Sequence, residues 1–134
     1  MQLAKRRHGS ALEITIADRM PYDEYVLAVN SSDILIDQCN SYGYAMNAII
    51  GLAMKKIVFS GAEPEALTAL GIPLEECPII NITPDPEQIA ASISALLLNS
   101  DMTQSLKLTG AAYAEKHHSL AKIAASHAAL CEKL

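Results

Sequence analysis

The alternation of apolar and polar stretches predicts strands and helices in turn along most of the chain. Residues 12–16 alternate apolar and polar side chains, as a half-buried strand does. The short apolar runs at 33–37, 57–59 and 78–82 are typical of buried parallel strands. Helices are predicted at 21–30, 45–54, 65–70, 85–98, 101–116 and 119–134. This order predicts an α/β fold with a Rossmann-like parallel sheet flanked by helices.

Capping residues set the expected bounds of the last three helices. Asp85 precedes a proline and is expected to cap the helix at 85–98. Asp101, with Gln104 three positions later, resembles a capping box. Ser119 is expected to cap the last helix, whose apolar stripe comprises Leu120, Ile123, Ala124, His127, Leu130, Cys131 and Leu134.

The length of 134 residues fits one domain. Residues 1–10 are mostly polar and are expected to form a tail, whereas residues 11–134 form a partial Rossmann-like domain.

Composition excludes several classes of protein. The net charge of −5 and the lack of a basic stripe argue against binding to nucleic acid. No apolar run is long enough to span a membrane, and the basic residues at 5–7 are not followed by the apolar segment of a signal peptide. Three widely spaced cysteines indicate neither a disulfide framework nor a zinc site. We therefore expect a cytoplasmic protein without a metal or other cofactor.

Chemistry in such a fold is expected in the loops at the carboxyl ends of the strands. These loops are residues 17–22, 38–44, 60–65 and 81–85. The second has the composition best suited to an anion, because Asn40, Ser41 and Gly43 are small or permissive and lead into a helix N-terminus. A phosphate could bind there. The alternative is that Ser41 only caps the helix and Gly43 only eases a turn.

The loop at 60–65 places two carboxylates beside a glycine turn. Glu63 and Glu65 could accept hydrogen bonds from the hydroxyl groups of a ribose or a sugar. The alternative is that both lie in a first helical turn because acidic residues are favoured there.

The segment from residue 21 onward resembles the C-terminal half of group-1 glycosyltransferases of the GT-B fold. The resemblance rests on Pro21–Tyr25, Ser32–Ile36, Gly51–Phe59 and the Gly61–Glu65 turn, and in order and spacing it covers residues 12–134. It implies the donor-binding part of an enzyme that transfers a sugar from a nucleotide-diphosphate sugar to a glycan or lipid-linked acceptor.

The resemblance also implies roles for particular residues. The diphosphate is expected at the loop that carries Asn40, Ser41, Tyr42, Gly43 and Tyr44. The loop at 18–21, which contains Arg19, is expected near the nucleobase, and Glu63 or Glu65 near hydroxyl groups.

This sequence departs from the family in two ways. The paired glutamates of the family fall on Tyr42 and Ile50, which carry no carboxylate. The acceptor-binding domain and the first strands of the family's donor domain have no counterpart in the sequence, which would leave the strand at 12–16 without its usual neighbour and favour a homo-oligomer. The chain is therefore expected to be inactive alone. The alternative is a non-catalytic glycosyltransferase-like remnant that serves in interaction or oligomerisation.

Overall fold

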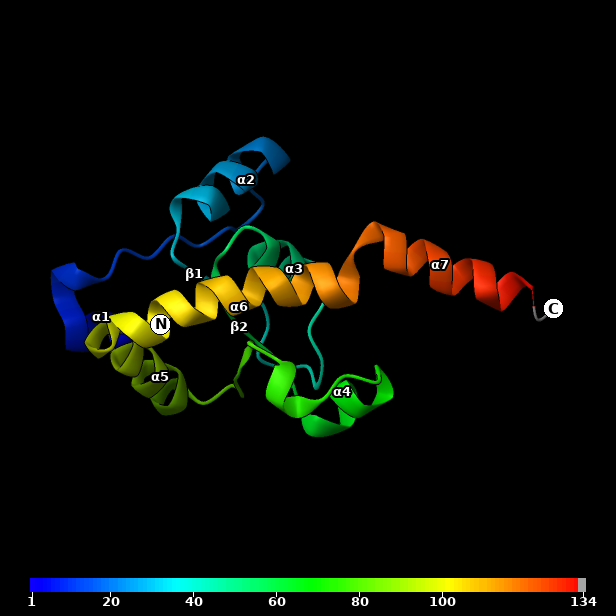
Figure 1. Ribbon diagram of the computed structural model, residues 1–134. Coiled ribbons are helices and arrows are strands. Elements are labelled where there is room, and N and C mark those ends of the chain that lie inside the picture. Colours follow the sequence, from blue (N-terminus) through cyan, green and yellow to red (C-terminus); the bar gives the residue numbers. More distant parts are fainter. Residues whose placement is uncertain (133–134) are drawn as a thin grey trace.

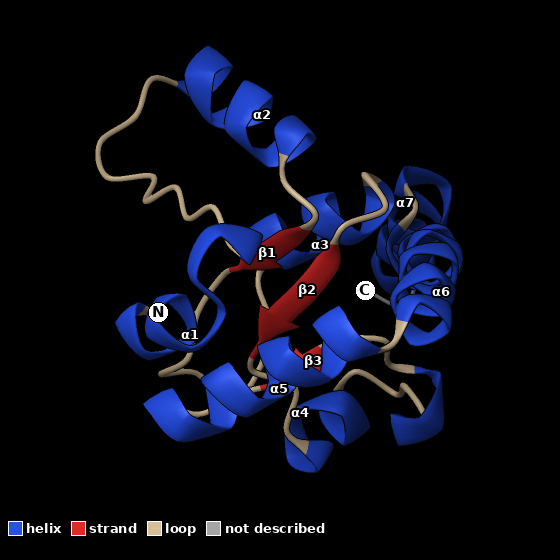
Figure 2. Cartoon of the chain, turned by 90° about the vertical axis from the view of Figure 1, so that its left-hand side faces the viewer, coloured by secondary structure: helices blue, strands red, loops and turns tan. Residues whose placement is uncertain are grey.

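The computed structural model describes residues 1–132 and shows a three-stranded parallel sheet between two layers of helices (Figures 1 and 2). The strands β1 (Ile34–Ile36), β2 (Ile57–Ser60) and β3 (Ile80–Asn81) lie in the order β1-β2-β3. Leu35 lies opposite Val58, and Phe59 lies opposite Ile80. The predicted α/β fold with a parallel sheet flanked by helices is confirmed.

The described residues form seven α-helices, and all the predicted helices are among them. Short 3-10 turns follow the first helix and precede β3, at Gly9–Ala11 and Leu74–Glu76. The α-helices are α1 (Gln2–His8), α2 (Tyr22–Ser31), α3 (Met46–Ala53), α4 (Pro64–Ala69), α5 (Pro86–Leu98), α6 (Ser100–His118) and α7 (Leu120–Cys131).

The side chains of β2 alternate between two hydrophobic clusters, one on each face of the sheet. Ile57 and Phe59 pack in a cluster with residues of α1 and α5. Val58 packs in the other cluster with residues of α3 and α6. All four residues of β2, including the polar Ser60, are buried, as expected of a parallel strand covered on both faces.

The expected polar tail at residues 1–10 is wrong, because most of this segment is the helix α1. Ala4 is only 1% exposed and belongs to the cluster that contains α5. Arg7 forms an ion pair with Glu87 at the start of α5, and the Nε2 atom of His8 lies 2.7 Å from the Oγ atom of Ser94. A small apolar surface and polar contacts along α5 therefore hold the segment.

The expected strand at residues 12–16 is also wrong. The segment is not part of the sheet and runs as an irregular connection from the 3-10 turn to α2 (Figure 2). Leu12 packs against the cluster of α1 and α5, but Ile16 is 78% exposed. Alternation alone does not form a strand, because a strand also needs a neighbour whose backbone accepts and donates its hydrogen bonds.

The helix caps match the sequence in part. Asp85 caps α5 by accepting a hydrogen bond from the backbone N–H of Glu87. The cap of α6 is Asn99, whose Oδ1 atom accepts from the N–H of Met102 at 2.9 Å, and not Asp101 as expected. Ser119 occupies the N-cap position of α7 but makes no capping hydrogen bond with its side chain.

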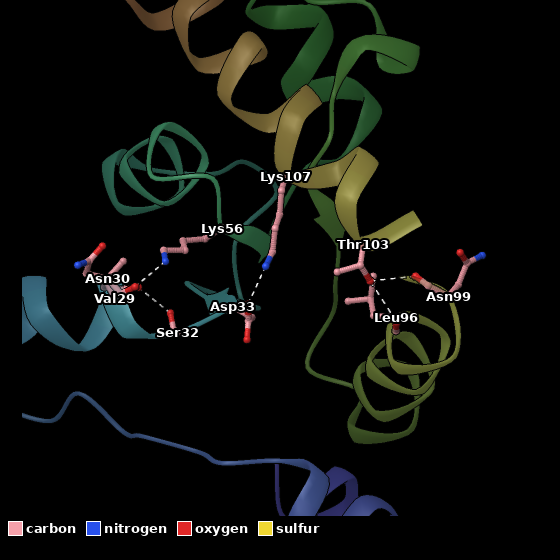
Figure 3. A network of polar contacts seen from close by, with 9 residues as sticks. All are labelled: Val29, Asn30, Ser32, Asp33, Lys56, Leu96, Asn99, Thr103 and Lys107. Atoms are coloured by element: carbon pink, nitrogen blue, oxygen red, sulfur yellow. Dashed lines mark hydrogen bonds and ion pairs between the residues drawn. The ribbon is translucent and has the colours of Figure 1, made fainter. Parts of the chain in front are cut away.

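Polar contacts fasten the amino-terminal edge of the sheet (Figure 3). The ammonium group of Lys107 on α6 lies 2.6 Å from a carboxylate oxygen of Asp33, directly before β1. Lys56, directly before β2, donates to the carbonyl of Asn30 at the end of α2. Asp33 and both lysines thus belong to the edge opposite to the one where ligands of such sheets bind.

The last helix projects from the end of α6 away from the sheet (Figure 1). No residue of α7 is buried, and Leu120 is 85% exposed. The expected apolar stripe is therefore uncovered along Leu120–Cys131, and Leu134 lies outside the described residues. None of the helices described is both long and apolar enough to cross a membrane.

Candidate functional site

The loops after β1 and β2 meet at the carboxyl edge of the sheet. The backbone N–H of Glu63 donates to the carbonyl of Tyr42 at 2.8 Å, which joins the two loops directly. A Cβ atom on Gly61 would lie 1.9 Å from the carbonyl oxygen of Ser41, so only glycine permits this approach. The structure thus brings together the two segments that the sequence singled out for phosphate and for hydroxyl groups.

Side chains hold the loop at 41–43 in a compact turn. The amide of Gln38 and the hydroxyl of Ser41 both donate to the carbonyl of Gly43, each at 2.8 Å. The first turn of α4 lies against the same loop, because a Cβ atom on Gly43 would be 3.4 Å from that of Ala66. Gln38, which the sequence interpretation did not assign, is a structural element of this loop.

The N-terminus of α3 carries no side-chain cap. Its N-cap residue is Ala45, which has no polar side-chain atom, and Ser41 donates to Gly43 instead. The alternative in which Ser41 caps this helix is therefore wrong. The first N–H groups of a helix have no intrahelical acceptor, and with the positive end of the helix dipole they favour an anion.

Glu63 and Asn81 form a polar pair at the ends of β2 and β3. Asn81 donates from its Nδ2 atom to a carboxylate oxygen of Glu63 at 3.1 Å, and its Oδ1 atom accepts from the N–H of Ala62. The Glu63 side chain is thus oriented toward the neighbouring strand. Asn81 lies at the end of β3, where the predicted strand at 78–82 meets the loop at 81–85, and residue type alone assigns it no role.

The remaining predicted residues lie around this edge. Asn40 and Tyr42 are exposed on the loop, and Glu65 is exposed in the first turn of α4, as the alternative interpretation of that residue expected. Arg19 lies in the exposed connection before α2, with a left-handed backbone φ of 51°. Among the described residues, no hydrogen bond or ion pair joins Arg19 to the other predicted residues of the site.

Tyr44 points away from solvent and joins the loop to α6. Its hydroxyl group lies 2.6 Å from the hydroxyl of Tyr113 and 2.9 Å from the Nε2 atom of His118. Burial raises the pKa of both tyrosines above the ordinary value, and for Tyr113 the hydrogen bond with Tyr44 adds to this shift. Burial, with His117 and Lys122 nearby, lowers the pKa of His118. The Tyr44 side chain therefore packs against α6.

Tyr42 and Ile50, which align with glutamates in the resemblance to group-1 glycosyltransferases, carry exposed side chains without a carboxylate. Tyr42 is 81% exposed and Ile50 is 36% exposed. Ile50 lines a groove of about 280 Å³ between α2 and α3, together with Tyr22, Tyr25, Val26, Val29, Asn47 and Met54. This face of α3 offers surface for packing and no carboxylate.

Within residues 1–132, no group of histidine, cysteine, aspartate and glutamate side chains is arranged to hold a metal ion. The chain matches no family model, and no curated protein or solved structure matches it either.

Proposed function

We propose that this chain is the donor-binding part of a glycosyltransferase that uses a nucleotide-diphosphate sugar. The diphosphate would lie against the loop at 40–44 and the first turn of α3. The observation that carries the proposal is the close approach of Gly61 to the carbonyl of Ser41, which holds two loops together beside an uncapped helix N-terminus. Such a site binds phosphate through backbone N–H groups and the helix dipole.

The neighbouring carboxylate supports the same function. Glu63 lies at this edge and its orientation is set by Asn81, so the second carboxylate oxygen can accept hydrogen bonds from sugar or ribose hydroxyl groups. Catalysis in a glycosyltransferase of this type would consist mainly of positioning the donor and stabilising the leaving diphosphate. The acceptor would be bound by a part of the enzyme outside this sequence, so we expect no transferase activity from this chain alone.

Two substitutions test the proposed donor site. Gly43→Val fills the space beside α4 without requiring a left-handed backbone, and we expect it to weaken the binding of the preferred nucleoside diphosphate at least tenfold, about 1.4 kcal/mol. Glu63→Gln preserves an acceptor for Asn81 and removes the charge, so it should weaken binding of the complete sugar donor more than that of the diphosphate. Glu65→Gln is the matched control, and titration calorimetry is the measurement. Unchanged affinities in folded Gly43→Val protein would contradict the assignment.

A second candidate function is a non-catalytic interaction module that forms a homo-oligomer. Two observations favour it. Asp33 and Asp37 flank β1, and the hydrogen bonds from the N–H of Asp37 to the carbonyl of Phe59 and from the N–H of Ile57 to the carbonyl of Asp33 direct them toward β2. By alternation, the N–H and C=O groups of Ile34 and Ile36 face the outer edge of the sheet. The helix α7 also has no buried residue. Light scattering tests this function, because a monomer at all concentrations would exclude a homo-oligomer.

A further inference from the structure

Among the described residues, Tyr44 is the only residue of the loop at 40–44 whose side chain makes a hydrogen bond to α6. Tyr44 follows Gly43 directly and precedes the N-cap residue of α3. Its hydroxyl contacts Tyr113 at 2.6 Å and His118 at 2.9 Å, and these partners lie more than a helical turn apart on α6. One side chain of the candidate site thus makes two hydrogen bonds to a helix that is distant in the sequence.

The surroundings of these contacts are tightly packed. Tyr113 is only 4% exposed and belongs to the core cluster with Ala48 and Leu52 of α3. The rings of Tyr44 and Tyr113 meet edge to face, with their centroids 6.3 Å apart, and the ring of His118 lies 5.6 Å from that of Tyr44. A buried hydrogen-bonded group of this kind has one favourable arrangement, because breaking it leaves polar atoms without partners.

The other side of the loop is fixed independently. The carbonyl of Tyr42 accepts from Glu63, and the carbonyl of Gly43 accepts from Gln38. These contacts attach the loop to Gln38, two residues after β1, and to Glu63, the N-cap residue of α4. None of them holds the segment between Gly43 and the first turn of α3, which is the part that faces an anion at the helix N-terminus.

We propose that Tyr44, Tyr113 and His118 are positioning residues that fix the 43–46 segment, and with it the N–H groups at the start of α3, for the diphosphate of the donor. The inference rests on the proposed function for the identity of the ligand. It adds that the C-terminal part of α6, from Tyr113 to His118, sets the geometry of the site. None of the three side chains touches the ligand, and each acts through the backbone at Tyr44.

Hydrogen exchange tests this positioning without any ligand. The amides of Ala48 and Ile49 donate to the carbonyl of Ala45, and the amide of Glu63 donates to the carbonyl of Tyr42, so all three report on the segment around Tyr44. In Tyr44→Phe and Tyr113→Phe, which retain the rings, we expect exchange of Ala48 and Ile49 to accelerate roughly threefold to tenfold, as the loss of one or two hydrogen bonds implies for a local opening. The amide of Glu63 should change less, and Tyr22→Phe, which removes an exposed hydroxyl, is the matched control.

A second measurement separates this inference from the proposed function. Titration of the same variants with the nucleoside diphosphate that binds the wild-type protein should show an affinity loss of similar factor, at temperatures where all variants remain folded. If the wild type binds no diphosphate, the proposed function fails and exchange alone decides the positioning role. If the wild type binds but neither exchange nor affinity changes in the variants, the positioning inference is overturned and the proposed function stands. Should Tyr44→Phe not fold, Tyr113→Phe, which leaves the contact between Tyr44 and His118, decides the matter.

Discussion

Gly61 is the residue at which the candidate site tolerates least change. In Gly61→Ala, the new Cβ atom would meet the carbonyl oxygen of Ser41 at 1.9 Å, so the two loops must separate. We expect a loss of about 1–3 kcal/mol in the free energy of unfolding, typical of overpacking. Gly43→Ala is the control, since its nearest neighbour is 3.4 Å away and it should change stability by no more than about 0.5 kcal/mol. Urea denaturation measures both, and equal losses would contradict this account of the contact.

His118 makes the stability of the chain depend on pH. Burial, with the charges of His117 and Lys122, lowers the pKa of His118, so the folded chain binds a proton there less readily than the unfolded chain. The stability that neutral His118 contributes is complete above the pKa of about 6.5 that it has in the unfolded chain. This stability is lost as the pH falls toward the lower pKa that it has in the folded chain. We expect His118→Gln to lose less stability than the wild type between about pH 7.5 and pH 5.5. Urea denaturation at the two pH values tests this, and identical losses would count against it.

At the scale of elements, the N-terminus of α6 distinguishes the structure from the sequence prediction. Asn99 accepts a hydrogen bond from the N–H of Met102, whereas Asp101 is the second residue of the helix. Asn99→Ala should therefore destabilise the protein by about 0.5–2 kcal/mol, as loss of a helix cap does. Asp101→Ala should cost only the interaction with the helix dipole, about 0.3–1 kcal/mol. Thermal unfolding compares the two, and a larger loss for Asp101→Ala would restore the capping box expected from the sequence.

The connection at residues 12–16 offers a second test at this scale. The backbone N–H of Thr15 has no acceptor among the described residues, and the residue is exposed. Proline lacks the backbone N–H, which is unused at this position, and its fixed φ suits an extended backbone. We therefore expect Thr15→Pro to change the free energy of unfolding by less than about 1 kcal/mol. A loss above about 3 kcal/mol would mean that this segment is paired in a sheet.

These elements also show how much the sequence could predict. The runs at β1, β2 and β3 are apolar on both faces and lie between helices, so their local pattern and their tertiary environment agree. The pattern at 12–16 is equally regular, but whether this segment forms a strand depends on a neighbouring strand with a free edge, which the local sequence does not reveal. The helix α1 was missed for the opposite reason, because its burial depends on a few residues, chiefly Ala4, against α5.

The candidate site was predictable in position and less so in contacts. The loops at the carboxyl edge follow from the order of strands and helices, and the glycine turn at Gly61 follows from composition. The pairing of Glu63 with Asn81 and of Tyr44 with Tyr113 could not be predicted, because these residues come from distant parts of the chain. The place of Tyr44 beside Gly43 suggests a contact with a ligand. Only the structure shows that its side chain packs against α6 instead.

At the scale of the whole molecule, the sheet and α6 together form one framework for the site. The contact of Lys107 with Asp33 holds α6 at the amino edge, and the contacts of Tyr113 and His118 with Tyr44 hold it at the site. The exposed α7 and the outer edge of β1 remain available for contact with another chain. Donor binding and self-association are therefore compatible with this architecture, and only donor binding depends on the loop at 40–44.

The most direct test of the central proposal is a thermal-shift screen of the wild-type chain with UDP, GDP, ADP and CMP. A ligand present at about 100 times its dissociation constant stabilises the folded state by about 2.7 kcal/mol, which raises the melting temperature by several degrees. The account predicts a saturable shift with one nucleoside diphosphate and a smaller shift with the others. A chain that melts cooperatively and shows no shift with any of them would contradict donor binding and favour the interaction module.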